Sequence, residues 1–289
     1  MMQTIEATGP NAAQIEYWNR EAGAKWVAFQ ELMDKQIEGF GHDVMERLAP
    51  APGERLLDVG CGCGQTALEL AARVGDSGHV TAVDISAPML ARTRQRIGEA
   101  GLGNVDVINA DAATYPLPEA AFDAVFSRFG VMFFADPVAA FGNLRRALKP
   151  TGRIAFACWR TLPENPWAAL PIQAVADLID IPKPEPGAPG PFSMADRARI
   201  ESILKGAGFA DIAIAPLDRK VAIGGTGTLA EINRLIIRLG PVSRLLADAD
   251  EDTIKQAETR TCEALTPYYD GMQVTLPGAA WICMARATA

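Results

Sequence analysis

A glycine-rich turn between an apolar strand and a helix constrains this 289-residue chain more than any other segment. Residues 54–59 are predicted as a strand, with Leu56 and Leu57 as its apolar part and Asp58 just before its end. Three glycines then follow at every second position: Gly60, Gly62 and Gly64. Residues 65–74 continue with the pattern of a helix, whose first N–H groups are free to face a ligand. Since glycine adopts positive φ and lets a ligand approach the main chain, the segment predicts a nucleotide-type cofactor site.

A second acid stands at the spacing that such a site needs. Residues 79–84 form another apolar strand, and its last residue, Asp84, comes 20 residues after Gly64. A carboxylate at this place can accept hydrogen bonds from both hydroxyls of a ribose. Dinucleotide dehydrogenases use the same logic, so the glycines and the acid do not separate the two cofactor types. The G-x-G-x-G spacing and the acid Asp58 before the turn favour a cofactor other than a dinucleotide.

Residues 57–64 resemble motif I of the class I S-adenosylmethionine-dependent methyltransferases. Four further segments resemble, in the family's order, its second-strand acid, its adenine-contact segment, its fourth strand and the turn before its fifth: 83–86, 109–112, 122–128 and 148–153. The resemblance covers residues 54–159, which is more specific than any single glycine motif. It is strongest to the branch that includes ubiquinone and menaquinone C-methyltransferases and many enzymes of small molecules.

The resemblance implies S-adenosyl-L-methionine as the cofactor and assigns its contacts. The glycine turn would hold the amino-acid end near Asp58, Asp84 would hold the ribose, and Asp111 would accept from the adenine. The implied cofactor-binding set is Asp58, Gly60, Cys61, Gly62, Gly64, Asp84, Ile85, Met89, Asp111, Ala112, Ser127 and Arg128. Asp84 could instead cap the next helix, and Asp111 could simply favour a turn. Cys61 and Cys63 are expected to be small turn residues rather than metal ligands.

The alternation of patterns predicts an α/β fold: a Rossmann-like, doubly wound, mostly parallel seven-stranded sheet with helices on both faces. Expected strands are 54–59, 79–84, 105–109, 122–128 and 153–159, and expected helices are 65–74, 87–100 and 136–148. Beyond residue 160 we expect a proline-rich loop at 163–191, a helix at 196–205, strands at 210–215, 273–276 and 280–285, and an interrupted helical insertion at 229–264. The predicted organisation is a helical lid (1–50), a cofactor-binding core (51–160) and a remainder with the acceptor-site insertion (161–289).

The N-terminal segment is the predicted acceptor side. Apolar residues recur at helical spacing over residues 15–38, and glycines at 39 and 41 are expected to end that helix before a second one at 42–48. The residues expected to form an acceptor pocket or lid are Tyr17, Trp18, Trp26, Phe29, Met33, Phe129 and Met132. Plain core packing of the helix is an equal alternative. His42 is a weak candidate for a general base, because a lone histidine is more often structural.

Composition limits the partners. A net charge of −8 argues against a broad nucleic-acid surface, and the arginines at 92, 94 and 96 are expected on a solvated helix. No membrane span or signal peptide is predicted, and five unpatterned cysteines suggest a reducing cytoplasm. We expect a small, hydrophobic or aromatic acceptor and a monomer or homodimer. A protein or RNA methyltransferase, or a protein that binds the cofactor without turnover, remains the alternative.

Overall fold

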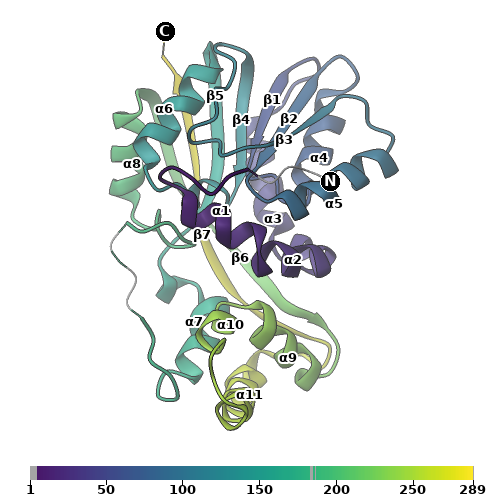
Figure 1. Ribbon diagram of the computed structural model, residues 1–289, viewed down its shortest axis with the longest axis vertical. Helices are drawn as coiled ribbons and strands as arrows, with labels where there is room; N and C mark the ends of the chain where they lie inside the picture. The colour runs from purple at the N-terminus through teal and green to yellow at the C-terminus, as the bar shows by residue number, and fades with distance from the viewer. Residues whose placement is uncertain (1–4, 183–184, 186, 289) are drawn as a thin grey trace.

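A seven-stranded sheet forms the centre of the computed structural model, which describes residues 5–182, 185 and 187–288 (Figure 1). The strand order is β3-β2-β1-β4-β5-β7-β6, with β1 to β5 parallel and β7 antiparallel to both of its neighbours. The strands are β1 (Arg55–Val59), β2 (His79–Asp84), β3 (Val105–Asn109), β4 (Phe122–Arg128), β5 (Leu148–Trp159), β6 (Phe209–Thr226) and β7 (Gln273–Ala287). The predicted mostly parallel sheet is confirmed.

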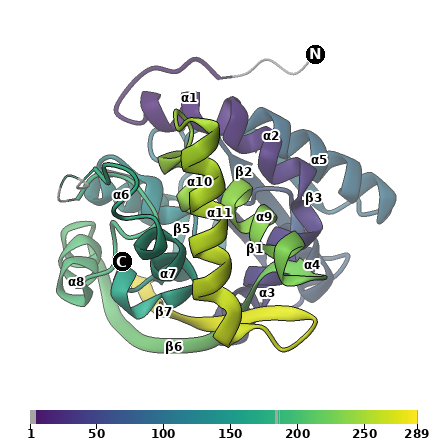
Figure 2. The same cartoon turned by 90° about the horizontal axis from the view of Figure 1, so that it is seen from below.

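Helices cover both faces of this sheet (Figure 2). The chain moves in one direction from β1 through β2 to β3 and in the other direction from β4 to β5, so right-handed crossovers place their helices on opposite faces. One face carries α3 (Gln30–Leu48), α4 (Gln65–Val74) and α5 (Ala87–Glu99), and the other carries α6 (Pro137–Ala147) and α8 (Arg197–Gly206). The helices predicted between residues 54 and 159 agree with these bounds within one residue.

The N-terminal segment differs from its prediction. Three helices replace the single one expected over residues 15–38: α1 (Ala12–Asn19), α2 (Glu21–Ala28) and α3. The chain turns at Arg20 and at Phe29, which both depart from helical dihedral angles. Helix α3 continues through Gly39 and Gly41, where its end was expected. An added Cβ at Gly41 would lie 3.0 Å from Cδ of Arg128, so this glycine serves close packing inside the helix.

The C-terminal half holds longer strands than predicted. Strands β6 and β7 have 18 and 15 residues, and they pair as a ribbon that extends beyond the rest of the sheet (Figure 1). At the far end of this ribbon lie α9 (Leu229–Leu239), α10 (Val242–Leu245) and α11 (Glu251–Leu265), which confirms the interrupted helical insertion. The expected loop at 163–191 contains α7 (Pro166–Ala174), and part of its proline run lies outside the described residues.

The helix α7 forms although Pro171 lies inside it. Pro166 begins the helix, where the missing N–H costs nothing, and Asn165 donates from its side chain to three backbone carbonyls nearby. The predicted loop was therefore wrong over residues 166–174. The many prolines of the whole segment indicated a loop, whereas a proline at the first position of a helix is compatible with it. No helix among the described residues is both long enough and apolar enough to cross a membrane.

The ends of β1 and β4 meet through two glycines. Gly60 follows β1 with φ of 71°, and an added Cβ there would lie 2.8 Å from Cα of Gly130, which follows β4. A Cβ on Gly130 would in turn lie 2.7 Å from the Val59 carbonyl oxygen. The strand order reverses between β1 and β4, and in open α/β sheets ligands bind at that point. The backbone contact therefore shapes the place where a ligand is expected.

Replacement of Gly60 by Ala should destabilise the protein. The positive φ alone costs an L-residue about 1 to 2 kcal/mol, and the contact with Gly130 requires a backbone shift as well. Urea unfolding measures the loss. Gly98→Ala is the matched control, because an added Cβ there meets no atom within 4 Å and alanine favours the helix. Equal stability of Gly60→Ala and the unmodified protein would show that this contact is not tight.

Candidate functional site

A cavity of about 350 Å³ opens beside the glycine turn. Its inner wall consists of loops that follow β1, β2, β3 and β4, and its outer wall of residues from the N-terminal helices and from α9 and α10. The predicted site residues that line it are Tyr17, Trp18, Trp26, Met33, Gly60, Cys61, Gly62, Asp84, Ile85, Met89, Asp111, Ala112, Arg128, Phe129 and Met132. The fold thus brings together most residues of the two predicted sets.

Five predicted residues do not line the cavity. Asp58, Gly64 and Ser127 lie behind the glycine turn, where Ser127 donates to the Val59 carbonyl at 2.7 Å and accepts from the Gly130 N–H at 3.2 Å. Gly64 has φ of 84° and begins α4 against Thr93. These three residues shape the turn from behind. The other two residues are Phe29 and His42.

His42 lies away from the cavity, on the part of α3 that faces α4. Its Nε2 is 3.1 Å from a carboxylate oxygen of Glu69, and about half of its side chain is exposed. The expectation that this histidine lies near the pocket is therefore wrong. The two glycines that precede it do not end the helix, so α3 carries His42 further along the sheet than expected.

Asp84 stands at the edge of the cavity where β2 ends. Its two oxygens accept from the N–H groups of Gly62, at 2.9 Å, and Ser86, at 2.8 Å. Burial raises the pKa of this carboxyl, and the backbone hydrogen bonds from Ser86 and Gly62 oppose that effect. The carboxylate therefore links the glycine turn to the start of α5 and still presents oxygen to the cavity.

Asp58 is fully buried, and only one of its oxygens has a partner. Thr66 donates to Oδ2 at 2.6 Å, while Oδ1 has no hydrogen-bond partner among the described residues. Burial raises the pKa of Asp58 to about 7, against the hydrogen bond from Thr66 and the positive charge of Arg128. An unpartnered buried oxygen is costly, and it fits a site completed by a donor or a cation.

Asp111 begins the loop after β3. Its Oδ1 accepts from the Asn11 side chain at 3.1 Å and from the Ala113 N–H at 2.9 Å. The side-chain oxygen of Asn11 accepts from the Ala135 N–H at 2.7 Å. One side-chain amide therefore joins the N-terminal segment to the loops after β3 and β4. The second oxygen of Asp111 remains available at the cavity wall.

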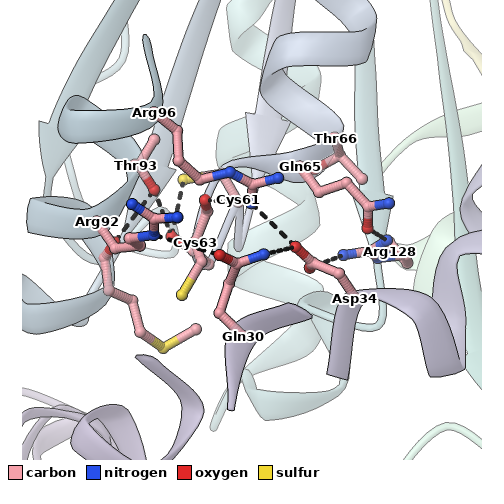
Figure 3. A network of polar contacts seen from close by, with 12 residues as sticks. Gln30, Asp34, Cys61, Cys63, Gln65, Thr66, Arg92, Thr93, Arg96 and Arg128 are labelled. Carbon is pink, nitrogen blue, oxygen red and sulfur yellow. Dashed lines mark hydrogen bonds and ion pairs between the residues drawn. The ribbon is translucent and has the colours of Figure 1, made fainter. Parts of the chain in front are cut away.

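A charged network closes the cavity on the side of α3 (Figure 3). The Asp34 carboxylate accepts from Arg96 of α5 at 2.9 Å and from Arg128 at 3.3 Å, and its side chain is only 8% exposed. Gln30 donates to the same carboxylate at 2.5 Å, and Gln65 of α4 accepts from Arg128 at 2.5 Å. Burial lowers the pKa of Arg128, and the Asp34 charge opposes that change.

Asp34 was not among the predicted site residues, and of its two arginine partners Arg128 was predicted at the cofactor whereas Arg96 was expected in solvent. Arg92 donates to Gln30 at 3.2 Å, and Arg96 donates to the Cys63 carbonyl at 2.9 Å, so both contact α3 or the glycine turn. A single signal was present: Gln30 and Asp34 are four residues apart, which places both polar groups on one side of the helix.

Aromatic side chains form a further part of the cavity wall. Phe129 adopts φ of 61°, and its ring stacks on Trp159 at 4.0 Å between centroids. Trp18 of α1 meets Phe133 edge-on at 5.4 Å. A non-glycine residue with positive φ at the cavity is a strained position that the packing holds in place. The arrangement joins polar groups that can hold a nucleoside to a water-excluding apolar chamber.

Comparison with known proteins gives a methyltransferase-domain family that matches residues 56–152. The chain is similar to a nocamycin O-methyltransferase of Saccharothrix syringae, with 36% identity over 49% of this chain and 51% of that protein. It is also similar to a demethylmenaquinone methyltransferase of Listeria welshimeri, with 34% identity over 39% of this chain and 48% of that protein. The chain spans about half the length of these curated relatives.

A solved structure shares the fold. Phosphoethanolamine N-methyltransferase 2 of Haemonchus contortus, in complex with S-adenosyl-L-methionine, superposes with a TM-score of 0.59. The identity is 19%, and the match covers 95% of this chain and 60% of that chain. At this identity the likeness concerns the fold alone, and it extends beyond the matched domain into the C-terminal half.

The raised pKa of Asp58 predicts how stability depends on pH. Between about pH 4 and 7 the native state binds more protons at this carboxyl than the unfolded state does, because the native pKa lies above the usual 3.8. Stability should therefore fall as pH rises through this window, by at most about 1.4 kcal/mol per pH unit. In Asp58→Asn this contribution should be absent.

Urea unfolding of both proteins at pH 5, 6 and 7 measures the effect as a difference between two curves. Asp76→Asn, in the exposed turn before β2, is the matched control and should run parallel to the unmodified protein. Parallel curves for Asp58→Asn would mean that the carboxyl titrates at its ordinary pKa.

Proposed function

We propose that this chain is a class I S-adenosylmethionine-dependent methyltransferase and transfers a methyl group to a small organic acceptor. One observation carries the proposal: acids suited to a nucleoside and a wall of aromatic side chains line one continuous cavity. A macromolecular acceptor would need an elongated or basic surface, whereas this chain has a net charge of −8.

The residues present fit the cofactor. The glycine turn leaves main chain open to the amino-acid end, and the unpartnered Asp58 oxygen, which is buried behind that turn, can attract the ammonium group through a water. The Asp84 carboxylate can accept from both ribose hydroxyls, and the second oxygen of Asp111 can accept from the adenine amino group. Met89 and Ile85 then supply an apolar wall against the base.

Positioning supports the transfer more than a fixed acid or base does. S-adenosylmethionine, when bound, supplies a methyl group on a positively charged sulfur. The aromatic rings can attract that charge and exclude water, and a cavity that holds both reactants close supplies much of the rate through orientation. A base is needed only where the acceptor atom must lose a proton, and the placement of His42 does not support that role.

We also propose that α1 and α2, within the predicted lid of residues 1–50, act as the lid of this site, whereas α3 packs on the sheet through buried residues such as Phe40 and Val44. Ile15 is the one buried residue of α1, and polar contacts join the helix to the start of α5: Asn19 donates to the Ile85 carbonyl at 2.8 Å and accepts from the Ala87 N–H at 2.9 Å. The Trp18 carbonyl accepts from the Ser86 hydroxyl at 2.8 Å. A few local hydrogen bonds can break without loss of the core, which suits an element that opens for the cofactor.

Transfer can be tested with S-adenosylmethionine that carries a labelled methyl group. Incubation of the protein with this cofactor and a metabolite extract should label small organic molecules, because the cavity is small and lined mostly by apolar side chains. Separate incubations with total RNA and with total protein are the comparison. Label in RNA or protein would replace the proposed acceptor class, and bound cofactor without any transfer would indicate a binding protein.

Replacement of Asp84 by Ala should weaken uptake of labelled S-adenosylhomocysteine at least about tenfold in equilibrium dialysis. The substitution removes the acceptor for two ribose hydroxyls, and a tenfold loss corresponds to about 1.4 kcal/mol. Asp76→Ala is the matched control, since this exposed acid lies in the turn before β2 and does not line the cavity. Unchanged uptake by Asp84→Ala would show that the nucleoside binds elsewhere.

A further inference from the structure

A second cavity of about 380 Å³ continues the first one outward, between the N-terminal helices and the helices at the end of the β6–β7 ribbon. We name it the outer chamber; its lining includes Tyr17, Trp18 and Trp26 from α1 and α2, and Leu239, Ser243 and Arg244 from α9 and α10. All six residues also line the main cavity, whereas the glycine turn lines only the main one. The outer chamber is therefore the end of the site that lies farther from the cofactor residues.

Arg244 is a cation held at this end without an acidic partner. Its guanidinium lies 4.5 Å from the centre of the Tyr17 ring. No hydrogen bond or ion pair joins this guanidinium to another side chain or carbonyl among the described residues. The ring orients the charged group but occupies none of its five N–H donors, which form a fork that matches a carboxylate. The geometry therefore presents an available anion-binding group.

The charges of the site are divided between its two ends. The acids that line the main cavity are Asp34, Asp84 and Asp111, and all three lie on the side of the glycine turn, α3 and the loops after the strands. In the described part of the chain, no Asp or Glu lines the outer chamber, whereas Arg244 does. In a chain with a net charge of −8, this cation favours an anionic ligand group.

From this arrangement we infer that the methyl acceptor is an aromatic or other apolar molecule with a carboxylate at the end remote from the methylated atom. The apolar body lies in the main cavity, and Arg244 binds the carboxylate in the outer chamber. The Ser243 hydroxyl lines the same chamber and can donate to the same group. The inference rests on the proposed function, because it names the acceptor class of that site.

A competition experiment on the whole protein tests the inference without knowledge of the natural acceptor. N-phenyl-1-naphthylamine, a neutral fluorescent probe, reports occupancy of the apolar cavity in the presence of S-adenosylhomocysteine. Two competitors of nearly the same shape then displace the probe: 2-naphthoate, which carries a negative charge, and 2-naphthamide, which is neutral. The unmodified protein should prefer the carboxylate by about fivefold to tenfold, which is the size of one charge-assisted contact at a partly exposed site. High salt should reduce this preference.

Arg244→Gln should abolish the preference and leave the affinity for the neutral probe within a factor of two. Arg238→Gln removes one exposed positive charge from the neighbouring α9, outside both cavities, and should retain the preference. A preference that persists in Arg244→Gln, or that is lost equally in Arg238→Gln, would overturn the inference. Absence of S-adenosylhomocysteine uptake by the unmodified protein would instead refute the proposed function, so the two failures are distinguishable.

Discussion

The contact between the backbones of Gly60 and Gly130 is the constraint on which the site depends. Two neighbouring parallel strands end at the same edge of the sheet, and their continuations must leave in different directions to open a ligand site. Here the two continuations leave so close together that a Cβ on either glycine would meet main-chain atoms. The turn after β1 therefore passes close over the strand ends, and the Gly62 N–H donates to the Asp84 carboxylate. The cavity begins at this contact.

Buried charge is organised around the same edge. Asp34 and Arg128 come from the lid side and from the sheet respectively, and each is less than a tenth exposed. Burial of a charged pair is not in itself a large source of stability, because desolvation offsets the attraction. Its effect here is geometric: Arg96 and Arg128 hold α3 at a fixed distance from the glycine turn through one carboxylate. The ion pairs of Asp34 with Arg96 and Arg128 therefore fix the spacing between α3 and the glycine turn at the edge of the cavity.

The sequence predicted the half of the fold whose signals are local. The strands and helices between residues 54 and 159 follow from apolar runs, glycine turns and a proline at the start of α6, and the bounds agree within one residue except at β5, which begins at Leu148 rather than at residue 153. The breaks at Arg20 and Phe29 carry no glycine or proline signal, and the end of α3 was mispredicted because Gly39 and Gly41 were taken as helix ends, whereas both pack inside the helix against Arg219 and Arg128. Strands β6 and β7 were predicted too short, since an exposed two-stranded ribbon has a weaker apolar pattern than a buried strand.

The same distinction separates the two ends of the site. The cofactor end consists of residues within motifs of fixed spacing, so a single sequence could nominate Asp84 and Asp111, and both line the cavity. The acceptor end depends on which residues α9 and α10 place opposite α1, and more than two hundred residues separate Tyr17 from Arg244. No local pattern encodes such a contact. Because the β6–β7 ribbon carries these helices away from the sheet, their sequence can change without strain on the glycine turn. Under the proposed function, the helices at the end of the ribbon, which place Leu239, Ser243 and Arg244 at the cavity, distinguish one acceptor from another.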